Sequence, residues 1–245
     1  MDRTELYDVM AARKSAPKDF GTYIGDNGRV NRCARMMQQG QINHGGKLLD
    51  IGGGIGDLAH LVVQQKKLFD SAVVLDISKK NLEAAASKGC TGILADVDKQ
   101  GIPVVEQFNV ITALDFIEHI IDPENFAREC YRCLKTGGEV FINTPNIQYW
   151  EHIKYLADGR FPHTSGDREV FHGGHLAFFT YLDLHDIFSN AGFHKCEQLK
   201  DDDGFRQPPT NFNATFMVPP KTQNEYVEWS MRFGNPNLLF RATKR

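Results

Sequence analysis

The 245-residue sequence predicts an α/β fold with a doubly wound, mostly parallel sheet. Two observations support this class. Short apolar runs alternate with segments of helical periodicity through the middle of the chain, and a glycine-rich turn follows the first apolar run. Strands separated by helices of this length pair in parallel through right-handed crossovers, so helices are expected on both faces of the sheet.

The expected elements follow from periodicity and from residues that start or stop helices. The strands are expected at Lys47–Ile51, Ala72–Asp76, Thr91–Ala95, Phe108–Leu114, Glu139–Asn143, Phe193–Leu199 and Leu238–Thr243. The helices between them are expected at residues 57–69, 79–88, 123–134 and 181–190. Ser78 is the expected cap of the second helix, and Asp122-Pro123 is a favourable start for the third.

The length is compatible with a single domain over residues 1–245. Residues 1–46 are expected to form a helical cap ahead of the sheet. Two stretches interrupt the alternation of strands and helices and are expected to be insertions. Residues 144–178 are aromatic- and histidine-rich, and residues 201–236 precede the last strand. Long irregular segments inside a compact domain are usually lids or binding segments, so we expect the first insertion to cover a substrate site.

The composition argues against several classes of partner. The chain has 28 Lys and Arg against 31 Asp and Glu, a net charge of −3, which gives no basic footprint for nucleic acid or an anionic membrane. No apolar run approaches the roughly 20 residues that span a bilayer. The first residues are charged and lack the apolar core of a signal peptide, so we expect a cytoplasmic protein. The five cysteines include one close pair, Cys130 and Cys133, whose helical spacing favours burial over zinc binding.

The glycine turn Asp50-Ile-Gly-Gly-Gly-Ile-Gly56 is the most informative motif. It lies where a strand passes into a helix, which is where open α/β sheets bind ligands. A dinucleotide fingerprint GxGxxG counted from Gly52 requires a glycine at position 57, where this chain has Asp57. A P-loop is excluded because no Gly-Lys-Ser/Thr follows. The pattern is therefore GxGxG, preceded by an acid.

Two further acids lie at the ends of the next two expected strands. Asp76 follows Gly56 by twenty residues and could accept both hydroxyls of a ribose. Asp96 follows after another twenty residues and could accept an adenine amino group. Each residue alone could be an ordinary turn or cap aspartate. Together with the glycine turn they predict a nucleoside site at one edge of the sheet.

These motifs resemble those of class I S-adenosylmethionine (SAM)-dependent methyltransferases, in particular the small-molecule O-methyltransferases of the ubiquinone-pathway type. The matching segments are LLDIGGGIGDLA (48–59), VVLDIS (73–78), ILADVD (93–98), FNVITALDFIEHIIDP (108–123), CLKTGGEVFINTPN (133–146) and HLAFFTYLDLHDIFSNAGF (175–193). The resemblance implies a seven-stranded sheet with N-terminal helices and a lid insertion, and SAM as cofactor with S-adenosylhomocysteine as product. Thr136 departs from the family, which commonly has proline before this Gly-Gly pair.

The resemblance also implies which residues hold the cofactor, and they lie at successive strand ends. They are Asp50, Gly52, Gly53 and Gly54 at the methionine end, Asp76 at the ribose, Ile77 against the adenine, Asp96 and Val97 at the adenine edge, and the backbone of Leu114 at the amino-acid moiety.

The candidate catalytic residues follow the fourth expected strand or end the first insertion. His119 is the first choice as base for a hydroxyl acceptor, because an imidazole with a pKa near 6.5 suits proton transfer at neutral pH. Asp115, His172 and His175 are the other candidates. His119 could equally be structural, and the two later histidines could lie in an exposed turn. Some relatives of the ubiquinone type bind a divalent ion here, for which Asp115, Glu118 and His119 would be available, but no metal is predicted.

Two other groups have both a functional and a structural interpretation. Arg29, Arg32 and Arg35 could bind an acidic acceptor or form a solvated helix face. Tyr149, Trp150, Tyr155 and Phe161 could line an acceptor pocket or pack as a helix stripe.

The predicted function is SAM-dependent methyl transfer to a small-molecule acceptor, most simply at a hydroxyl, in a glycan, quinone or natural-product pathway. The alternatives are N-methylation of a small molecule, a non-catalytic SAM-binding regulator and an NAD-linked oxidoreductase, the last disfavoured by the glycine spacing. Neither a nucleic-acid nor a membrane partner is expected, and a homodimer stays open.

Overall fold

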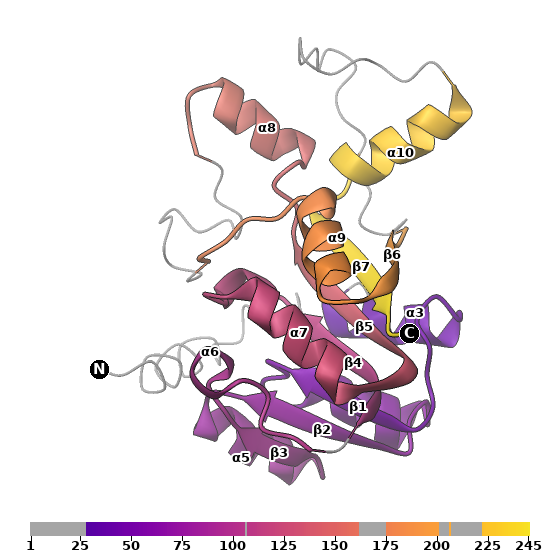
Figure 1. Cartoon of the computed structure of the whole chain (residues 1–245), viewed down its shortest axis with the longest axis vertical. Helices are drawn as coiled ribbons and strands as arrows, with labels where there is room; N and C mark the ends of the chain where they lie inside the picture. Colours follow the sequence, from indigo (N-terminus) through magenta and orange to yellow (C-terminus); the bar gives the residue numbers. More distant parts are fainter. Residues whose placement is uncertain (1–27, 106, 162–174, 201–205, 207–221) are drawn as a thin grey trace.

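The computed structural model describes residues 28–105, 107–161, 175–200, 206 and 222–245 (Figure 1). Most of the expected N-terminal cap, His172 and much of both insertions lie outside the described residues. Within them, no helix is both long and apolar enough to cross a lipid bilayer.

Seven strands form one sheet in the part of the chain that the structure describes, in the order β3-β2-β1-β4-β5-β7-β6. They are β1 (Lys47–Ile51), β2 (Ser71–Asp76), β3 (Thr91–Leu94), β4 (Phe108–Leu114), β5 (Leu134–Pro145), β6 (His194–Gln198) and β7 (Asn237–Thr243). Strands β1 to β5 pair in parallel, and β7 is antiparallel to both β5 and β6. The prediction of a mostly parallel seven-stranded sheet is confirmed.

Strand β5 is longer than the sequence predicts, because it begins at Leu134 directly after a helix. Leu134 pairs with Phe108, and the register then shifts so that Glu139 pairs with Val110. Gly137 lies in this irregularity with a φ of +75°. The pair Gly137-Gly138 therefore lies in an irregularity of the strand and does not end it.

All four expected helices between the strands are present. The structure adds one at Val97–Gln100, which was not expected, and one at Trp150–Ala157, which was one of the two interpretations of the aromatic group there. Their bounds are α3 (Arg29–Gln38), α4 (Asp57–His60), α5 (Lys79–Ser87), α6 (Val97–Gln100), α7 (Pro123–Cys133), α8 (Trp150–Ala157), α9 (Tyr181–Asn190) and α10 (Gln223–Phe233). Ser78 and Asp122 cap α5 and α7 as expected, each accepting a hydrogen bond from a backbone N–H three residues on. Thr180 and Asp183 form a reciprocal capping box at the start of α9.

Two helix predictions were wrong in detail. The helix expected at residues 57–69 is α-helical only as far as His60 and continues as a wider π-helical turn over Leu61–Gln65. It ends before Lys67, whose φ of +53° is incompatible with a continuing helix. Helix α10 was not anticipated, because most apolar residues of its sequence QNEYVEWSMRF fall at alternate positions and not at a helical spacing.

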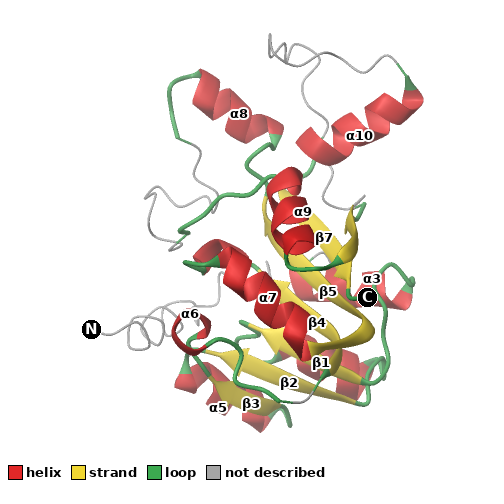
Figure 2. Ribbon diagram, in the orientation of Figure 1, coloured by secondary structure: helices red, strands yellow, loops and turns green. Residues whose placement is uncertain are grey.

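Helices lie on both faces of the sheet (Figure 2), and two apolar cores pack against it, one on each face. Helices α7 and α9 cover one face, where Phe126 and Phe188 are fully buried. Helices α3 and α4 cover the other face, where Met37 and Leu58 are buried. Strand β4 contributes to both cores because alternate side chains point to opposite faces. Both faces being covered explains why the central strands are almost continuously apolar.

Helices α8 and α10 extend from the main body beyond α9 and β7 (Figure 1). Both are fastened to the end of β5 through one buried residue, Asn146. Its side-chain amide donates hydrogen bonds to the carbonyl oxygens of Arg232 and Asn235, at 2.9 and 2.8 Å. Its own carbonyl oxygen accepts a hydrogen bond from Nδ1 of His152 in α8, at 2.8 Å. The described parts of the two insertions therefore share one anchor.

Candidate functional site

The glycine turn joins β1 to α4 at the carboxyl edge of the parallel strands. Gly52, Gly54 and Gly56 all have positive φ, at 66°, 56° and 75°. Backbone of this kind favours glycine, because a Cβ atom is strained there. The GxGxG spacing found in the sequence is therefore the spacing of the left-handed residues that reverse the chain.

The glycines also make room for particular neighbours. A Cβ on Gly52 would lie 2.4 Å from the ring of Phe116, and one on Gly53 would lie 2.6 Å from Oδ2 of Asp50. A Cβ on Gly54 would meet nothing within 4 Å. The turn thus packs against Phe116 and Asp50 on one side and faces open space at Gly54, where a ligand can approach the backbone.

Asp50 is a buried carboxyl next to the turn. Its Oδ1 accepts a hydrogen bond from the hydroxyl of Thr112 at 2.8 Å, and Thr112 is its register partner on β4. Burial raises the pKa of Asp50 to about 7, and the nearby carboxylates of Asp76 and Asp57 add to the rise, whereas the Thr112 hydrogen bond opposes it. A cation placed beside Asp50 would favour its ionised form.

Asp76, at the end of β2, organises the same edge of the sheet. Its Oδ2 accepts a hydrogen bond from the backbone N–H of Gly54 at 2.9 Å. Its Oδ1 accepts from the N–H of Ser78 at 2.8 Å and from the side-chain amide of Asn81 at 3.2 Å. These bonds fix the carboxylate beside the glycine turn, as the sequence spacing predicted.

The other predicted cofactor residues line the edge on either side of Asp76. Asp96 precedes α6, and its carboxylate lies 3.3 Å from the ammonium group of Lys99. Val97 is buried in the core on that side of the sheet. Ile77 and Leu114 are half-buried at the ends of β2 and β4. The structure therefore brings these residues to one edge, although no contact with a ligand is recorded.

Asp115 follows β4 in a conformation that is rare for a residue with a side chain, with a φ of +51°. Its N–H donates to the carbonyl oxygen of Asn143 at 2.8 Å, and its Oδ1 accepts from the side-chain amide of Asn143 at 2.5 Å. Its Oδ2 forms an ion pair with Arg29 of α3. Asp115 thus joins α3, β4 and β5, and its carboxylate is held by these two partners.

Glu118 lies in the short 3₁₀ turn Ile117–His119 and is almost completely buried. Its Oε2 accepts a hydrogen bond from the hydroxyl of Thr144 at 2.9 Å. Its carbonyl oxygen accepts from the N–H groups of Leu176 and Ala177, at 2.7 and 3.2 Å. The end of the first insertion is therefore held against the turn that follows β4.

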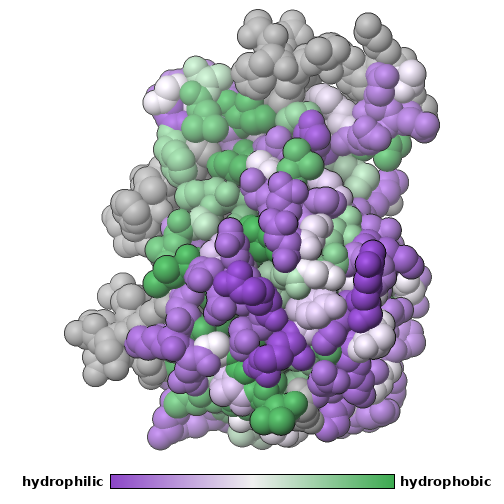
Figure 3. All heavy atoms as spheres, viewed as in Figure 1, coloured by the Kyte–Doolittle hydropathy of each residue, from purple (hydrophilic) through white to green (hydrophobic). Residues whose placement is uncertain are grey.

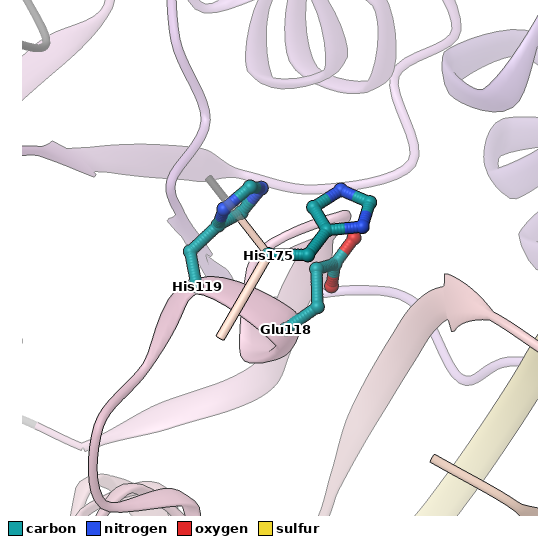
Figure 4. Close-up of side chains that lie close together, drawn as sticks. All are labelled: Glu118, His119 and His175. Atoms are coloured by element: carbon teal, nitrogen blue, oxygen red, sulfur yellow. The ribbon is translucent and has the colours of Figure 1, made fainter. Parts of the chain in front are cut away.

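This contact brings His175 to His119 (Figure 4). The two imidazole rings are 4.9 Å apart at their centroids and meet edge to face. One ligand atom each from Glu118, His119 and His175 lies within 4.8 Å of the other two. Two candidate catalytic histidines that are 56 positions apart in the sequence thus form one cluster, whereas His172 lies outside the described residues.

Three residues of this site were missed in the sequence. Thr112, Asn143 and Thr144 supply the hydrogen bonds that hold Asp50, Asp115 and Glu118. All three are polar residues in the buried parts of β4 and β5, next to apolar residues. Polar residues within apolar strand segments could have indicated these positions in the sequence, because a buried polar side chain normally has a hydrogen-bond partner.

Apolar side chains are exposed near the same region. Figure 3 shows hydrophobic residues on the surface around α8 and below it. In this part of the chain Leu156, Phe161 and Leu176 are each about half exposed, at 48%, 46% and 59%. The rings of Phe161 and Phe178 pack edge to face. Of the aromatic group considered in the sequence, Tyr149 is buried and Tyr155 is exposed on α8.

Residues 27–198 match the sequence model of a family of methyltransferase domains. The chain belongs to this methyltransferase domain family. The expectation of a class I, SAM-dependent methyltransferase is thereby confirmed at the level of the family. Membership accounts for the order of the motifs, because the glycine turn and the acids after β2 and β3 lie inside the matched range.

Curated relatives include the ubiquinone biosynthesis O-methyltransferases of Pseudomonas fluorescens strain SBW25 and Pseudomonas entomophila strain L48. Both are 34% identical to this chain, over 112 and 107 residues. Each match covers 42% of this chain and 45% of the relative. The chain therefore matches less than half the length of these methyltransferases.

Solved structures of other methyltransferases share the fold over most of the chain. A putative methyltransferase of Haloferax volcanii, solved with the Trm112 methyltransferase activator, matches with a TM-score of 0.61 and 18% identity over 99% of both chains. Phosphoethanolamine N-methyltransferase 2 of Haemonchus contortus, solved with phosphomonomethylethanolamine and S-adenosylhomocysteine, also matches with a TM-score of 0.61 and 18% identity. That match covers 99% of this chain and 58% of the other. These likenesses confirm the class I methyltransferase fold.

Proposed function

We propose that this methyltransferase-family chain transfers the methyl group of SAM to a hydroxyl of a small-molecule acceptor. The observation that carries the proposal is the paired arrangement of the glycine turn and Asp76, joined by the Gly54–Asp76 hydrogen bond. This bond holds a carboxylate beside backbone that a ligand can approach closely, because a Cβ on Gly54 would meet nothing within 4 Å. The SAM and S-adenosylhomocysteine complexes of the Haemonchus contortus neighbour, which has the same fold, support the choice of cofactor.

In this proposal the cofactor lies across the carboxyl edge of β1, β2 and β4. Asp50, Gly52, Gly53 and Gly54 surround the methionine end, and the buried carboxyl of Asp50 suits the cofactor's ammonium group. Asp76 accepts hydrogen bonds from the ribose hydroxyls, since a carboxylate can accept from both at once. Ile77 and Val97 pack against the adenine, Asp96 accepts from its amino group, and the backbone of Leu114 meets the amino-acid moiety.

The acceptor end of the site is the cluster of Glu118, His119 and His175. Methyl transfer from a sulfonium is an in-line displacement: the acceptor oxygen bonds to the methyl carbon, the carbon–sulfur bond breaks, and sulfur keeps the electron pair. A hydroxyl loses its proton in the process, and His119 is the proposed base. Asp115 has a positioning role, because Arg29 and Asn143 already hold its carboxylate.

Oxygen is the preferred target because of the relatives that match in sequence. The Pseudomonas proteins are ubiquinone biosynthesis O-methyltransferases, and their matches cover 42% of this chain. The N-methyltransferase neighbour agrees in fold only, so N-methylation of a small molecule is the second candidate. O-methylation and N-methylation differ in what they require of the Glu118, His119 and His175 cluster. A neutral amine needs no base before it attacks the methyl group, whereas a hydroxyl loses a proton.

Several features stay predictions. They are the lid role of residues 144–178, the second insertion at 201–236, a single domain with an N-terminal cap, a cytoplasmic location and a homodimer. The lid is supported by the hydrogen bonds from Leu176 and Ala177 to Glu118, which bring the end of the insertion to the acceptor cluster.

Titration calorimetry with SAM, S-adenosylhomocysteine and NAD tests the cofactor assignment. We expect saturable binding of the first two ligands and none of NAD. Incubation with radiolabelled SAM and a panel of hydroxylated and amine acceptors then tests the reaction. Binding of NAD without binding of SAM would contradict the proposal, and methylation confined to amines would favour the second candidate.

A further inference from the structure

We propose that Asp50 and Thr112 form a proton-linked binding site for the ammonium group of SAM. Asp50 is a neutral carboxylic acid before the cofactor binds and releases its proton when the ammonium group arrives. Thr112 is the positioning residue that prepares Asp50 for this change. The inference rests on the proposed function, because it concerns the cofactor end of the same site. It adds a proton to the binding reaction and a role for Thr112.

Asp50 lies where a negative charge is costly unless a cation is close. The residue is only 2% exposed, and the strand register places it beside Thr112 of β4. Its Oδ2 lies against the glycine turn, since a Cβ on Gly53 would be 2.6 Å from that oxygen. A buried carboxylate without a cationic partner is protonated more readily than one in water. Asp50 therefore faces the proposed cofactor site as an acid that a cation can ionise.

The titratable and charged groups around Asp50 come from three further elements. Burial, together with the carboxylates of Asp76 on β2 and Asp57 on α4, raises the pKa of Asp50 to about 7. On α3, burial and the nearby Asp50 raise the pKa of the Cys33 thiol well above its ordinary value, and the charge of Arg32 opposes that rise. Cys33 is therefore uncharged at neutral pH. Within the described residues, no cation is among the groups that shift the pKa of Asp50.

Thr112 is the neighbour that favours the ionised form of Asp50. Its hydroxyl donates a hydrogen bond to Oδ1 at 2.8 Å, and this bond lowers the pKa of the carboxyl. Thr112 is completely buried, so the bond forms away from water, where a hydrogen bond to a charged group is strong. Without the hydroxyl, ionisation of Asp50 would take a larger share of the binding energy of the cofactor. Thr112 thus keeps the acid within reach of ionisation at neutral pH.

Binding is then an exchange of one proton for one cation. The ammonium group of SAM approaches Asp50, the O–H bond of the carboxylic acid breaks, and the proton passes to the solvent. The carboxylate keeps the bonding electrons and forms an ion pair with the ammonium group. Below the pKa of free Asp50, affinity for the cofactor should therefore rise with pH, because less work is needed to remove the proton.

The test is calorimetric titration of the full chain with S-adenosylhomocysteine in buffers of different ionisation enthalpy, which counts the protons released per ligand bound. At pH 6 the amino group of the ligand is almost fully protonated, and an acid with a pKa of about 7 should release about 0.9 proton. Affinity should increase about five- to tenfold between pH 5.5 and 6.5. Asp50→Asn should release no proton and bind with an affinity that is constant over this range.

The threonine variants separate the role of the hydroxyl from a loss of fold. Thr112→Val keeps the shape of the side chain and should move the midpoint of the pH dependence upward, with severalfold weaker binding at pH 6.5. Thr112→Ser retains a hydroxyl and should restore the midpoint. Thr91→Val is the matched control, because Thr91 is exposed at the amino end of the edge strand β3. It should behave as the unaltered chain does, and melting curves show whether each variant is folded.

Binding of S-adenosylhomocysteine without proton release at pH 6 would overturn the inference and leave the proposed cofactor in place. An Asp50→Asn protein that releases as many protons as the unaltered chain, or a Thr112→Val protein with an unchanged midpoint, would also overturn it. If neither SAM nor S-adenosylhomocysteine binds at any pH from 5.5 to 8, the proposed function itself is contradicted, and the inference with it.

Discussion

The carboxylate of Asp76 accepts a hydrogen bond from the backbone N–H of Gly54, at 2.9 Å and across 22 positions of the chain. The bond joins the ends of β1 and β2, the two strands whose ends carry the most informative sequence motifs. It also orients the carboxylate before a ligand binds. A group held in this way loses less entropy on binding, and this favours affinity.

We expect Asp76→Ala to weaken SAM binding by about 1–3 kcal/mol, because the variant leaves ligand hydroxyls without their acceptor. Calorimetry measures the change, and melting curves check the fold. Asp70→Ala is the control, since Asp70 is exposed and precedes β2 at the end opposite Asp76, so it should have no effect. SAM binding unchanged in Asp76→Ala would contradict the proposed ribose contact.

Gly52→Ala should destabilise the chain and abolish SAM binding. The new methyl group would lie 2.4 Å from the ring of Phe116, in addition to the strain of a positive φ. Overpacking of this kind costs about 1–3 kcal/mol. Gly40→Ala is a matched control, because Gly40 has a similar φ of +72° with nothing within 4 Å. A melting temperature of Gly52→Ala equal to that of Gly40→Ala would show that Phe116 is not the obstacle.

The stability of the cofactor-free protein should fall as pH rises toward 7 because of Asp50. Its pKa is about 7 in the folded state, above the ordinary value of 3.8, so folding favours the protonated carboxyl. The stabilisation is complete below pH 3.8 and is lost progressively up to pH 7. Between pH 5.5 and 8 the change is about 2 kcal/mol. Asp50→Asn should melt with a flatter pH dependence, and an identical dependence in both proteins would contradict the assignment.

Once an acceptor is identified, His119→Ala should lower kcat by about 10²–10⁴ and leave the affinity for SAM nearly unchanged. The reason is that the imidazole faces the acceptor in the proposed arrangement, whereas the glycine turn and Asp76 are the groups proposed to hold the cofactor. His172→Ala and His175→Ala belong in the same assay. Full activity in His119→Ala, together with a large loss in one of the others, would move the role of base to that residue.

The sequence predicted the sheet, and the glycine turn and acids at its carboxyl edge, for a physical reason. Buried parallel strands are continuous apolar runs, and a ligand at their carboxyl ends requires glycines and acids at fixed offsets from those runs. Asp50, Gly54 and Asp76 could therefore be found from local spacing alone. Helix α10 could not, because its apolar residues mostly alternate along the sequence and do not follow a helical period.

The acceptor end was harder to predict because its contacts join distant parts of the chain. The ion pair of Arg29 with Asp115 spans 86 positions, and no local pattern reveals it. From the sequence alone, Asp115 is therefore interpreted as a second carboxylate that could take part in catalysis beside Glu118. The approach of His175 to His119 likewise depends on backbone hydrogen bonds to Glu118, which are independent of side-chain identity at Leu176 and Ala177.

The shared anchor at Asn146 has a consequence for engineering the acceptor specificity. The side chain of Asn146 binds the end of α10, and its backbone carbonyl binds α8. Replacing only one insertion with that of a relative would therefore remove the contacts of one helix and leave those of the other. Buried amide or carbonyl groups of Asn146 would then lack hydrogen-bond partners. Chimeras of this chain should therefore exchange both insertions together, with the residue at position 146 taken from the same donor as the two helices.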